Sequence, residues 1–281
     1  MNASFWNYPS KQKSWPIDEE MESLGEVIHP LDNIGGFDVR PGFYQMNGAY
    51  QTEEGVSFTV SSHGATSCVL LLFRPAAQEP YARIRIPESY KIGNTYSILV
   101  FGLKAEDFEY AYQMDGPADQ ARGLLFNRKL LDPYAKAVTG QRNWGEKPEG
   151  GKDFVYKARV VQSDFDWGRY RNLNHKFEDL VIYEMHVRGF TKDASSGVKG
   201  GGTFEGLRQK IPYLKDLGIN AVELMPIFEF DEMESARVVD GVQLYNYWGY
   251  NTVSFFAPNT SYAFHQEHNH EGDELKRLIR E

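Results

Sequence analysis

The sequence predicts a chain of two parts, an antiparallel β-sandwich followed by the start of a parallel α/β domain. Up to about residue 161, short apolar segments alternate with turn signals, and no convincing helix interrupts them. Farther along, an apolar strand, an amphipathic helix and a second apolar strand follow one another within about 45 residues. A length of 281 residues also suits roughly two domains of ordinary size.

The strands of the sandwich are indicated by alternating apolar and polar residues. Val56, Phe58 and Val60 alternate with serine and threonine, so one face of this strand should be buried. The continuous apolar run 69–73 is typical of a fully buried strand. Further strands are expected at 83–86, 96–101, 108–114 and 154–161. Glycine, asparagine and aspartate cluster between these segments, as turns require.

The α/β part begins with an expected strand at 180–187 and has a second at 219–225. Between them, apolar residues recur at spacings of three and four, which predicts one helix face: Phe204, Leu207, Ile211, Leu214 and Leu217. Thr203 can cap the start of this helix, and Gly218 can end it. Pro212 should kink the helix because proline removes a backbone hydrogen bond.

A last helix begins at 273 and runs to 281. The 101 residues from 181 to 281 thus hold only about two βα units. A closed eight-stranded barrel needs about 250 residues. An open sheet of two parallel strands would leave its edges and core uncovered. We therefore expect other sequence to complete this half, and we interpret the chain as cut short.

Composition excludes several classes of protein. Thirty Lys and Arg against 39 Asp and Glu leave a net charge of −9, which argues against a nucleic acid or an anionic membrane as partner. A hydrophobic content of 41% excludes wholesale disorder. Cys68 is the only cysteine, so no disulfide or cysteine metal cluster forms within the chain. Because neither a membrane-spanning run nor a signal peptide is recognisable, we predict a cytoplasmic protein.

Four segments of the sequence resemble parts of a known enzyme family, and they follow one another in the chain as those parts do in the family. Val181-Ile-Tyr-Glu-Met-His-Val-Arg-Gly-Phe-Thr191, Gly218-Ile-Asn-Ala-Val-Glu-Leu-Met-Pro-Ile227 and the segment 246–258 are similar to the first two barrel strands and the following loop of glycoside hydrolase family 13. The Tyr-Trp-Gly-Tyr-Asn form at 247–251 is most similar to the isoamylase and bacterial glycogen-debranching branch. Leu-Leu-Asp-Pro-Tyr-Ala-Lys-Ala at 130–137 resembles the end of a carbohydrate-binding module family 48 domain.

The resemblance implies a fold and a domain division. A sandwich of the family 48 module type would occupy 28–175, after an N-terminal extension at 1–27. The first βα units of an incomplete (β/α)8 TIM barrel would occupy 176–281. The fold class is thus multidomain, β followed by α/β.

The resemblance also implies an activity, the hydrolysis of α-1,6 branch linkages in glycogen, amylopectin or limit dextrin by a retaining two-carboxylate mechanism. The family's catalytic signatures are absent from the sequence, so the carboxylates should lie beyond residue 281 and the chain alone should be inactive. Two alternatives stay open. One is a non-catalytic α-glucan-binding protein, and the other, within the family, is a branching transferase.

The substrate-binding candidates are Asn246, Trp248 and Tyr250, together with Arg188. The resemblance implies that Tyr250 stacks under a sugar ring beside the scissile bond, since a rigid aromatic face suits the apolar face of glucose. Packing of the loop onto the barrel is the alternative. Arg188, at the expected end of the first strand, could line the site or not. No catalytic residue, cofactor or metal is expected in this chain.

Several further residues suggest sites that we set aside. For Glu184 and His186 an interior hydrogen-bond network is favoured over catalysis, because a Glu-x-His pair is weak evidence. For Trp144, packing is favoured over a glucan platform. The histidines at 265, 268 and 270 are better explained by a solvated loop than by a metal site. The Gly200–Gly202 loop could hold an anion but lacks the residues of a nucleotide site.

Overall fold

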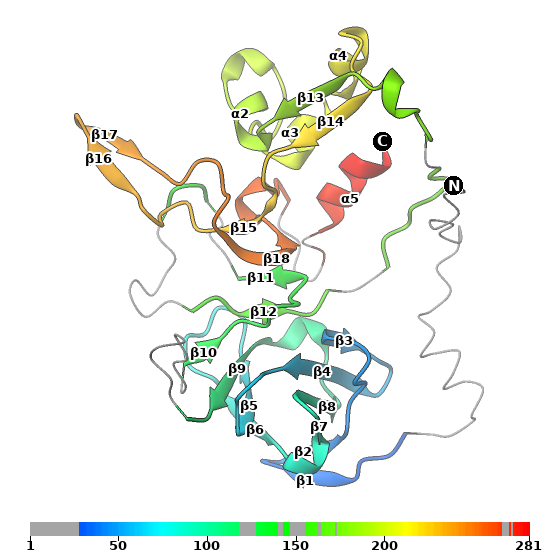
Figure 1. The fold of residues 1–281 in the computed structure, drawn as a ribbon, viewed down its shortest axis with the longest axis vertical. Coiled ribbons are helices and arrows are strands. Elements are labelled where there is room, and N and C mark those ends of the chain that lie inside the picture. The colour runs from blue at the N-terminus through cyan, green and yellow to red at the C-terminus, as the bar shows by residue number, and fades with distance from the viewer. Residues whose placement is uncertain are drawn as a thin grey trace.

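The computed structural model describes residues 28–117, 128–139, 143–146, 155–161, 164–171, 173–265, 270 and 272–281. In this part of the chain a β-sandwich is followed by an α/β part that lies beside it (Figure 1). The expected N-terminal extension at 1–27 lies outside the described residues. No described helix combines the length and the apolar character that crossing a membrane requires.

The sandwich consists of two antiparallel sheets. The first has the order β1-β2-β8-β4-β3, with β7 also paired to β8. Its strands are β1 (Asp32–Ile34), β2 (Phe37–Arg40), β3 (Gly48–Gln51), β4 (Gly55–Ser61), β7 (Lys91–Ile92) and β8 (Thr95–Phe101). The second has the order β11-β12-β9-β5-β6, with β10 also paired to β9. Its strands are β5 (Ser67–Phe73), β6 (Ala82–Ile86), β9 (Glu109–Asp115), β10 (Lys129–Leu130), β11 (Ala137–Val138) and β12 (Ala158–Arg159).

The core lies between these sheets, and the alternation in the sequence locates it. Val56, Phe58 and Val60 are all buried in it, as expected. The polar residues between them are buried too, because the chain near Phe43 covers the other face of β4: the Thr59 hydroxyl donates to the Phe43 carbonyl at 3.1 Å. Of the strand expected at 154–161, residue 154 lies outside the described residues, and within 155–161 only Ala158 and Arg159 pair as a strand.

The Asp-Pro-Tyr-Ala motif closes the sandwich through one buried carboxyl. Asp132 accepts hydrogen bonds from the Tyr110 hydroxyl and the Tyr134 backbone N–H, both at 2.8 Å. Burial raises the pKa of Asp132 to about 6, despite these bonds. The motif therefore joins the segment after β10 to Tyr110, near the start of β9.

The α/β part begins with β13 (Ile182–Met185) and β14 (Ala221–Leu224), which pair in parallel with Ile182 opposite Ala221. Three short helices connect them, α2 (Val187–Thr191), α3 (Phe204–Arg208) and α4 (Ile211–Asp216). The first strand ends earlier than the expected 187. The reason is that His186 caps α2, its side chain accepting the Gly189 backbone N–H.

The expected single kinked helix is two helices. Thr203 caps α3 as predicted, accepting the Gly206 N–H at 3.3 Å. Pro212 stands in the first turn of α4, where its missing N–H costs nothing, so the helix breaks before it. Gly218, with φ +88°, ends α4 as predicted. Leu217 is the exception on the apolar face, since it is exposed.

The remaining elements are β15 (Phe228–Phe230), β16 (Arg237–Val239), β17 (Val242–Leu244), β18 (Thr252–Pro258) and α5 (Asp273–Arg280). Short 3-10 helices lie at η1 (Glu88–Tyr90), η2 (Ala105–Asp107), η5 (Phe177–Asp179), η6 (Ala194–Ser196) and η7 (Thr260–Tyr262). β15 pairs with β18, whereas β16 and β17 form a hairpin that projects from the molecule (Figure 1).

β18 joins the two parts of the molecule, lying against β11 of the sandwich (Figure 1). Its Ala257 is buried in the sandwich core cluster. Phe256 stacks on Tyr134 with ring centroids 5.6 Å apart, and the Ser254 hydroxyl donates to the Ala135 carbonyl at 3.3 Å. β18 is therefore attached to the sandwich by both aromatic packing and a hydrogen bond. This attachment brings the segment before β18 close to the sandwich.

Candidate functional site

The candidate site is built on the loop 245–251, which leads from β17 into β18. Asn246 folds this loop from within. Its backbone N–H donates to the Glu232 carbonyl at 2.9 Å, and its side-chain amide donates to the Asp231 carbonyl at 3.3 Å. Its side-chain oxygen accepts the Gly249 N–H at 3.4 Å. The Asn246 side chain is thus occupied in holding the turn.

Two aromatic side chains project from this turn. Trp248 is 62% exposed and Tyr250 is 66% exposed, and their rings are 6.5 Å apart at 82°. Gly249 lies between them with φ +79°, and a Cβ there would come within 2.4 Å of the Phe230 ring. A glycine is therefore needed for the turn to sit on Phe230. The result is a fixed loop with two open aromatic faces.

His186 packs against the loop at Tyr247. Its ring stacks on Tyr247 at 4.1 Å and 9°, and its Nε2 lies 2.7 Å from the Tyr247 carbonyl oxygen. Its Nδ1 accepts the Gly189 N–H at 3.1 Å, so the tautomer with the proton on Nε2 satisfies both contacts. Burial is the main cause that lowers the pKa of His186 below its ordinary value. These contacts place His186 in a hydrogen-bond network, as favoured from the sequence.

Glu184 does not join this network. It is exposed on β13, directly opposite Glu223 of β14 in the parallel register. The strand expected at 180–187 would have placed Glu184 and His186 on one face, but this was wrong because the strand ends at Met185. His186 and Arg188 belong to the start of α2 instead.

Arg188 lies beside Trp144, in the lining of another cavity than Asn246. Its guanidinium is 4.7 Å from the centre of the Trp144 ring, and Trp144 in turn stacks on Tyr262 at 5.9 Å and 9°. Trp144 also contacts Tyr247 with ring centroids 5.9 Å apart. It is a packing residue, as favoured from the sequence. A cavity of about 530 Å³ borders Asn246, whereas Arg188 lines a separate cavity of about 720 Å³.

Two buried carboxyls lie beneath the loop, and the sequence interpretation missed both. Glu229 accepts the Thr260 backbone N–H at 2.7 Å, and Glu232 accepts the Ser261 hydroxyl at 2.9 Å. Both are 0% exposed. Burial raises the pKa of Glu229 to about 8 and that of Glu232 to about 7. Because neither can reach a ligand, they serve to fix η7 under the loop.

One group of described residues has the composition of a metal site. Asp164, His270 and Asp273 offer ligand atoms within 4.8 Å of one another. The Lys276 ammonium already binds Asp273 at 3.0 Å and would compete with a cation, so we assign no metal there. His268, from the histidine-rich stretch, lies outside the described residues.

Comparison with known proteins identifies the sandwich. Residues 46–135 match the family model of carbohydrate-binding module 48, the isoamylase N-terminal domain. The chain is 39% identical over 229 residues to isoamylase 3, chloroplastic, of Oryza sativa subsp. japonica. The matched region covers 77% of this chain and 29% of that protein. It is 32% identical over 240 residues to a glycogen debranching enzyme of Serratia proteamaculans, covering 80% of this chain and 35% of that protein.

Solved structures agree at the level of the fold. A pullulanase from Paenibacillus barengoltzii, in complex with maltohexaose and α-cyclodextrin, superposes with a TM-score of 0.67 at 22% identity, over 85% of this chain and 36% of that chain. This chain spans about a third of the length of the curated relatives that it matches. Residues 46–135 are therefore a carbohydrate-binding module 48 domain, and the chain corresponds to the N-terminal portion of the isoamylase and glycogen-debranching type of glycoside hydrolase family 13.

Proposed function

We propose that this chain is the glucan-binding N-terminal portion of an enzyme that hydrolyses α-1,6 branch linkages in glycogen, amylopectin or limit dextrin. The names of the relatives, isoamylase and glycogen debranching enzyme, support this substrate class. The observation that carries the proposal is the rigid loop that exposes Trp248 and Tyr250. The retaining two-carboxylate chemistry would come from residues outside this chain.

The domain division belongs to the same proposal. Residues 28–175 would form the sandwich unit, and 176–281 would form the first βα units of a (β/α)8 barrel. The parallel pairing of β13 with β14 supports this, as do the connecting helices between them. Ile182 and Val222 are about half exposed on these strands, which suits a sheet that continues on its open side.

Each candidate residue then has a distinct role. Tyr250 would stack on a glucose ring, and Trp248 would offer a second aromatic face at a steep angle to it. Asn246 would position the loop through its internal hydrogen bonds and would not contact the sugar. Arg188 would donate hydrogen bonds to sugar hydroxyls from the neighbouring cavity.

A second candidate function is α-glucan binding without hydrolysis. The complete burial of Glu229 and Glu232 favours it, because these carboxyls beneath the loop cannot contact a sugar. Within the enzyme family, a branching transferase differs from a hydrolase in its product. Analysis of chains released or transferred from amylopectin by a longer protein containing this sequence would separate the three.

The binding role is tested by replacing Tyr250 with alanine. We expect Tyr250→Ala to weaken maltohexaose binding about tenfold, equivalent to about 1.4 kcal/mol, whereas Tyr250→Phe should retain most of the affinity. Phe255→Ala is the matched control, since Phe255 is 65% exposed but lies on β18 outside the loop. The measurement is isothermal titration calorimetry. Equal affinities for the Tyr250→Ala and Phe255→Ala proteins would contradict the assignment.

A further inference from the structure

A second cavity, of about 720 Å³, is lined in part by Trp144, whose ring also contacts Tyr247 of the loop 245–251. Four segments surround it: α2 with Lys192 just after it, the glycine loop before α3, the chain following η7, and residues 143–146. Its volume is in the range of small-molecule sites, which is about 300–1,000 Å³. The loop around Trp248 and Tyr250 does not account for it.

Two cations face this cavity at a glycine. A Cβ added to Gly202 would lie 3.2 Å from Lys192 Cδ and 3.3 Å from Arg188 Cγ, so the missing side chain makes room for both. Gly202 also has φ +90°, which favours glycine. Within the part of the chain that the structure describes, neither cationic side chain forms a hydrogen bond or an ion pair. The stacking of Arg188 on Trp144 fixes the guanidinium while its N–H groups stay available.

The other walls supply acceptors and an aromatic face. Glu146 lines the same cavity, and its carboxylate accepts a hydrogen bond from the Asn143 amide at 2.9 Å, so the lining includes an acceptor group. Phe264 is 46% exposed, and one side of its ring packs against Gly200, where a Cβ would come within 2.8 Å. The cavity therefore presents donors, acceptors and one open apolar face.

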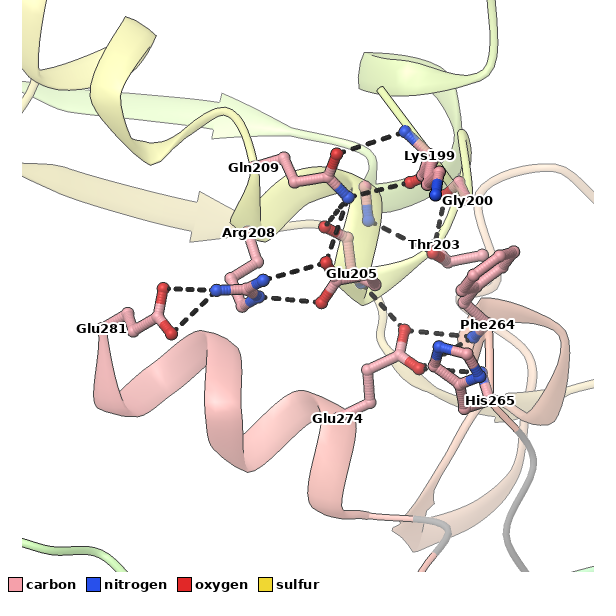
Figure 2. Close-up of polar contacts among 11 residues, drawn as sticks. Lys199, Gly200, Thr203, Glu205, Arg208, Gln209, Phe264, His265, Glu274 and Glu281 are labelled. Atoms are coloured by element: carbon pink, nitrogen blue, oxygen red, sulfur yellow. Dashed lines mark hydrogen bonds and ion pairs between the residues drawn. The ribbon is translucent and has the colours of Figure 1, made fainter. Parts of the chain in front are cut away.

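These walls are held in place by a polar network between α3 and α5 (Figure 2). The Glu274 carboxylate, 3% exposed, accepts the backbone N–H groups of Phe264 at 2.9 and 3.0 Å and of Glu205 at 2.8 Å. Gln209 bonds both the N–H and the carbonyl of Lys199, at 3.1 and 3.0 Å, at the start of the glycine loop. Because its walls are fixed beforehand, a ligand would lose little entropy by ordering them.

We propose that this cavity is a second binding site for an α-glucan oligosaccharide, separate from the loop of Trp248 and Tyr250. The inference rests on the proposed glucan-binding function. A neutral sugar can use the cationic donors, the Glu146 acceptor and the Phe264 face together. A single phosphate group would use only the donors and would be repelled by Glu146, so the mixed lining favours a sugar.

The test is a titration of the wild-type chain with maltohexaose, followed by NMR. We expect two sets of shifts, one at the Trp248 indole N–H and one at the Trp144 indole N–H and the Gly202 amide. Lys192→Ala should weaken the second response at least fivefold and leave the first unchanged. Lys199→Ala is the control, because it removes another exposed lysine, one that is not among the residues lining the cavity.

The outcomes separate this inference from the proposed function. Shifts at Trp248 without any at Trp144 or Gly202 would overturn the second site, and with it the sugar contact of Arg188, and would leave glucan binding by the loop of Trp248 and Tyr250 standing. No response at either indole would remove the proposed function itself. A response of Gly202 to inorganic phosphate but not to maltohexaose would make the cavity an anion site and would also overturn the proposal. Because the wild-type spectra decide these cases, the result does not depend on the folding of any variant.

Discussion

Asn246, Gly249 and His186 each hold one part of the loop that exposes the two aromatic side chains. Asn246 closes the turn with its side chain, Gly249 lets the turn lie on Phe230, and His186 binds the Tyr247 carbonyl oxygen. Replacing any of these three residues should disturb the loop, even if the residue itself does not contact a ligand. At the scale of the residue, the site therefore depends on backbone geometry as much as on its aromatic rings.

Gly249→Ala should weaken both the fold and glucan binding. A left-handed φ costs a residue with a Cβ about 1–2 kcal/mol, and here the Cβ would also clash with Phe230. Gly241→Ala is the matched control, since Gly241 has φ +78° and nothing within 4 Å of its added Cβ. We expect the Gly249 variant to show the lower melting temperature and at least several-fold weaker maltohexaose binding. Indistinguishable behaviour of the two variants would contradict the role of the Phe230 contact.

The contact between α3 and α5 is polar, and its two ends differ in burial. At one end Glu274 is buried and accepts backbone N–H groups from Glu205, Phe264 and His265 (Figure 2). At the other end Arg208 pairs with Glu281, whose side chain is 43% exposed, at 2.8 Å. A buried acceptor matters more than an exposed ion pair, because water cannot replace it.

Glu274→Ala should therefore destabilise the protein much more than Glu281→Ala. The first leaves three partly buried backbone N–H groups without their acceptor, at about 1 kcal/mol for each, the low end of the range for a buried donor. The second removes an exposed ion pair, worth about 0–1 kcal/mol. Urea unfolding of both variants measures the difference. Equal losses of unfolding free energy would show that the Glu274 bonds are replaced by water.

At the scale of the whole molecule, the β15–β18 pair is the junction on which the arrangement depends. β18 contributes Ala257 to the sandwich core, and the Glu229 and Glu232 carboxyls fix η7 under the loop on the other side. Burial raises the pKa of both carboxyls well above the ordinary value of 4.5. Ionisation of these groups should thus weaken the junction and the loop together.

Stability should fall as the pH rises from about 5 to 8 through these two groups. The unfolded chain releases their protons near pH 4.5, whereas the folded chain keeps them until about pH 7 for Glu232 and about pH 8 for Glu229. The folded state binds more protons in this window, so a higher pH favours unfolding. The double variant Glu229→Gln and Glu232→Gln should lose less melting temperature than the wild type between pH 5 and 8.5.

His186 has the opposite effect, because its lowered pKa makes the folded protein less stable as the pH falls below about 6.5. The wild type and the double variant both keep His186, so they share this effect. Their difference therefore isolates the two carboxyls. If the melting temperatures of the two proteins change with pH in the same way between pH 5 and 8.5, the expected contribution of Glu229 and Glu232 is contradicted.

Local patterns determined much of the fold from the sequence alone. The alternation at Val56–Val60 identified the core face of β4, because the side-chain period of a strand needs no knowledge of its neighbours. Thr203 and Gly218 marked helix ends correctly for the same reason, since capping is a contact between residues close in the chain. The residues of the aromatic loop were also recognisable by their order in the sequence, although their role stays a prediction.

Tertiary structure alone decided where the site residues lie relative to one another. Arg188 faces a cavity apart from Tyr250 because the first strand ends at Met185 and Trp144 packs between α2 and the loop. The burial of Glu229 and Glu232 could not be predicted, since the residues that cover them come from η7 and β18. Contacts between distant segments set these features, and no local period or spacing in the chain records such contacts.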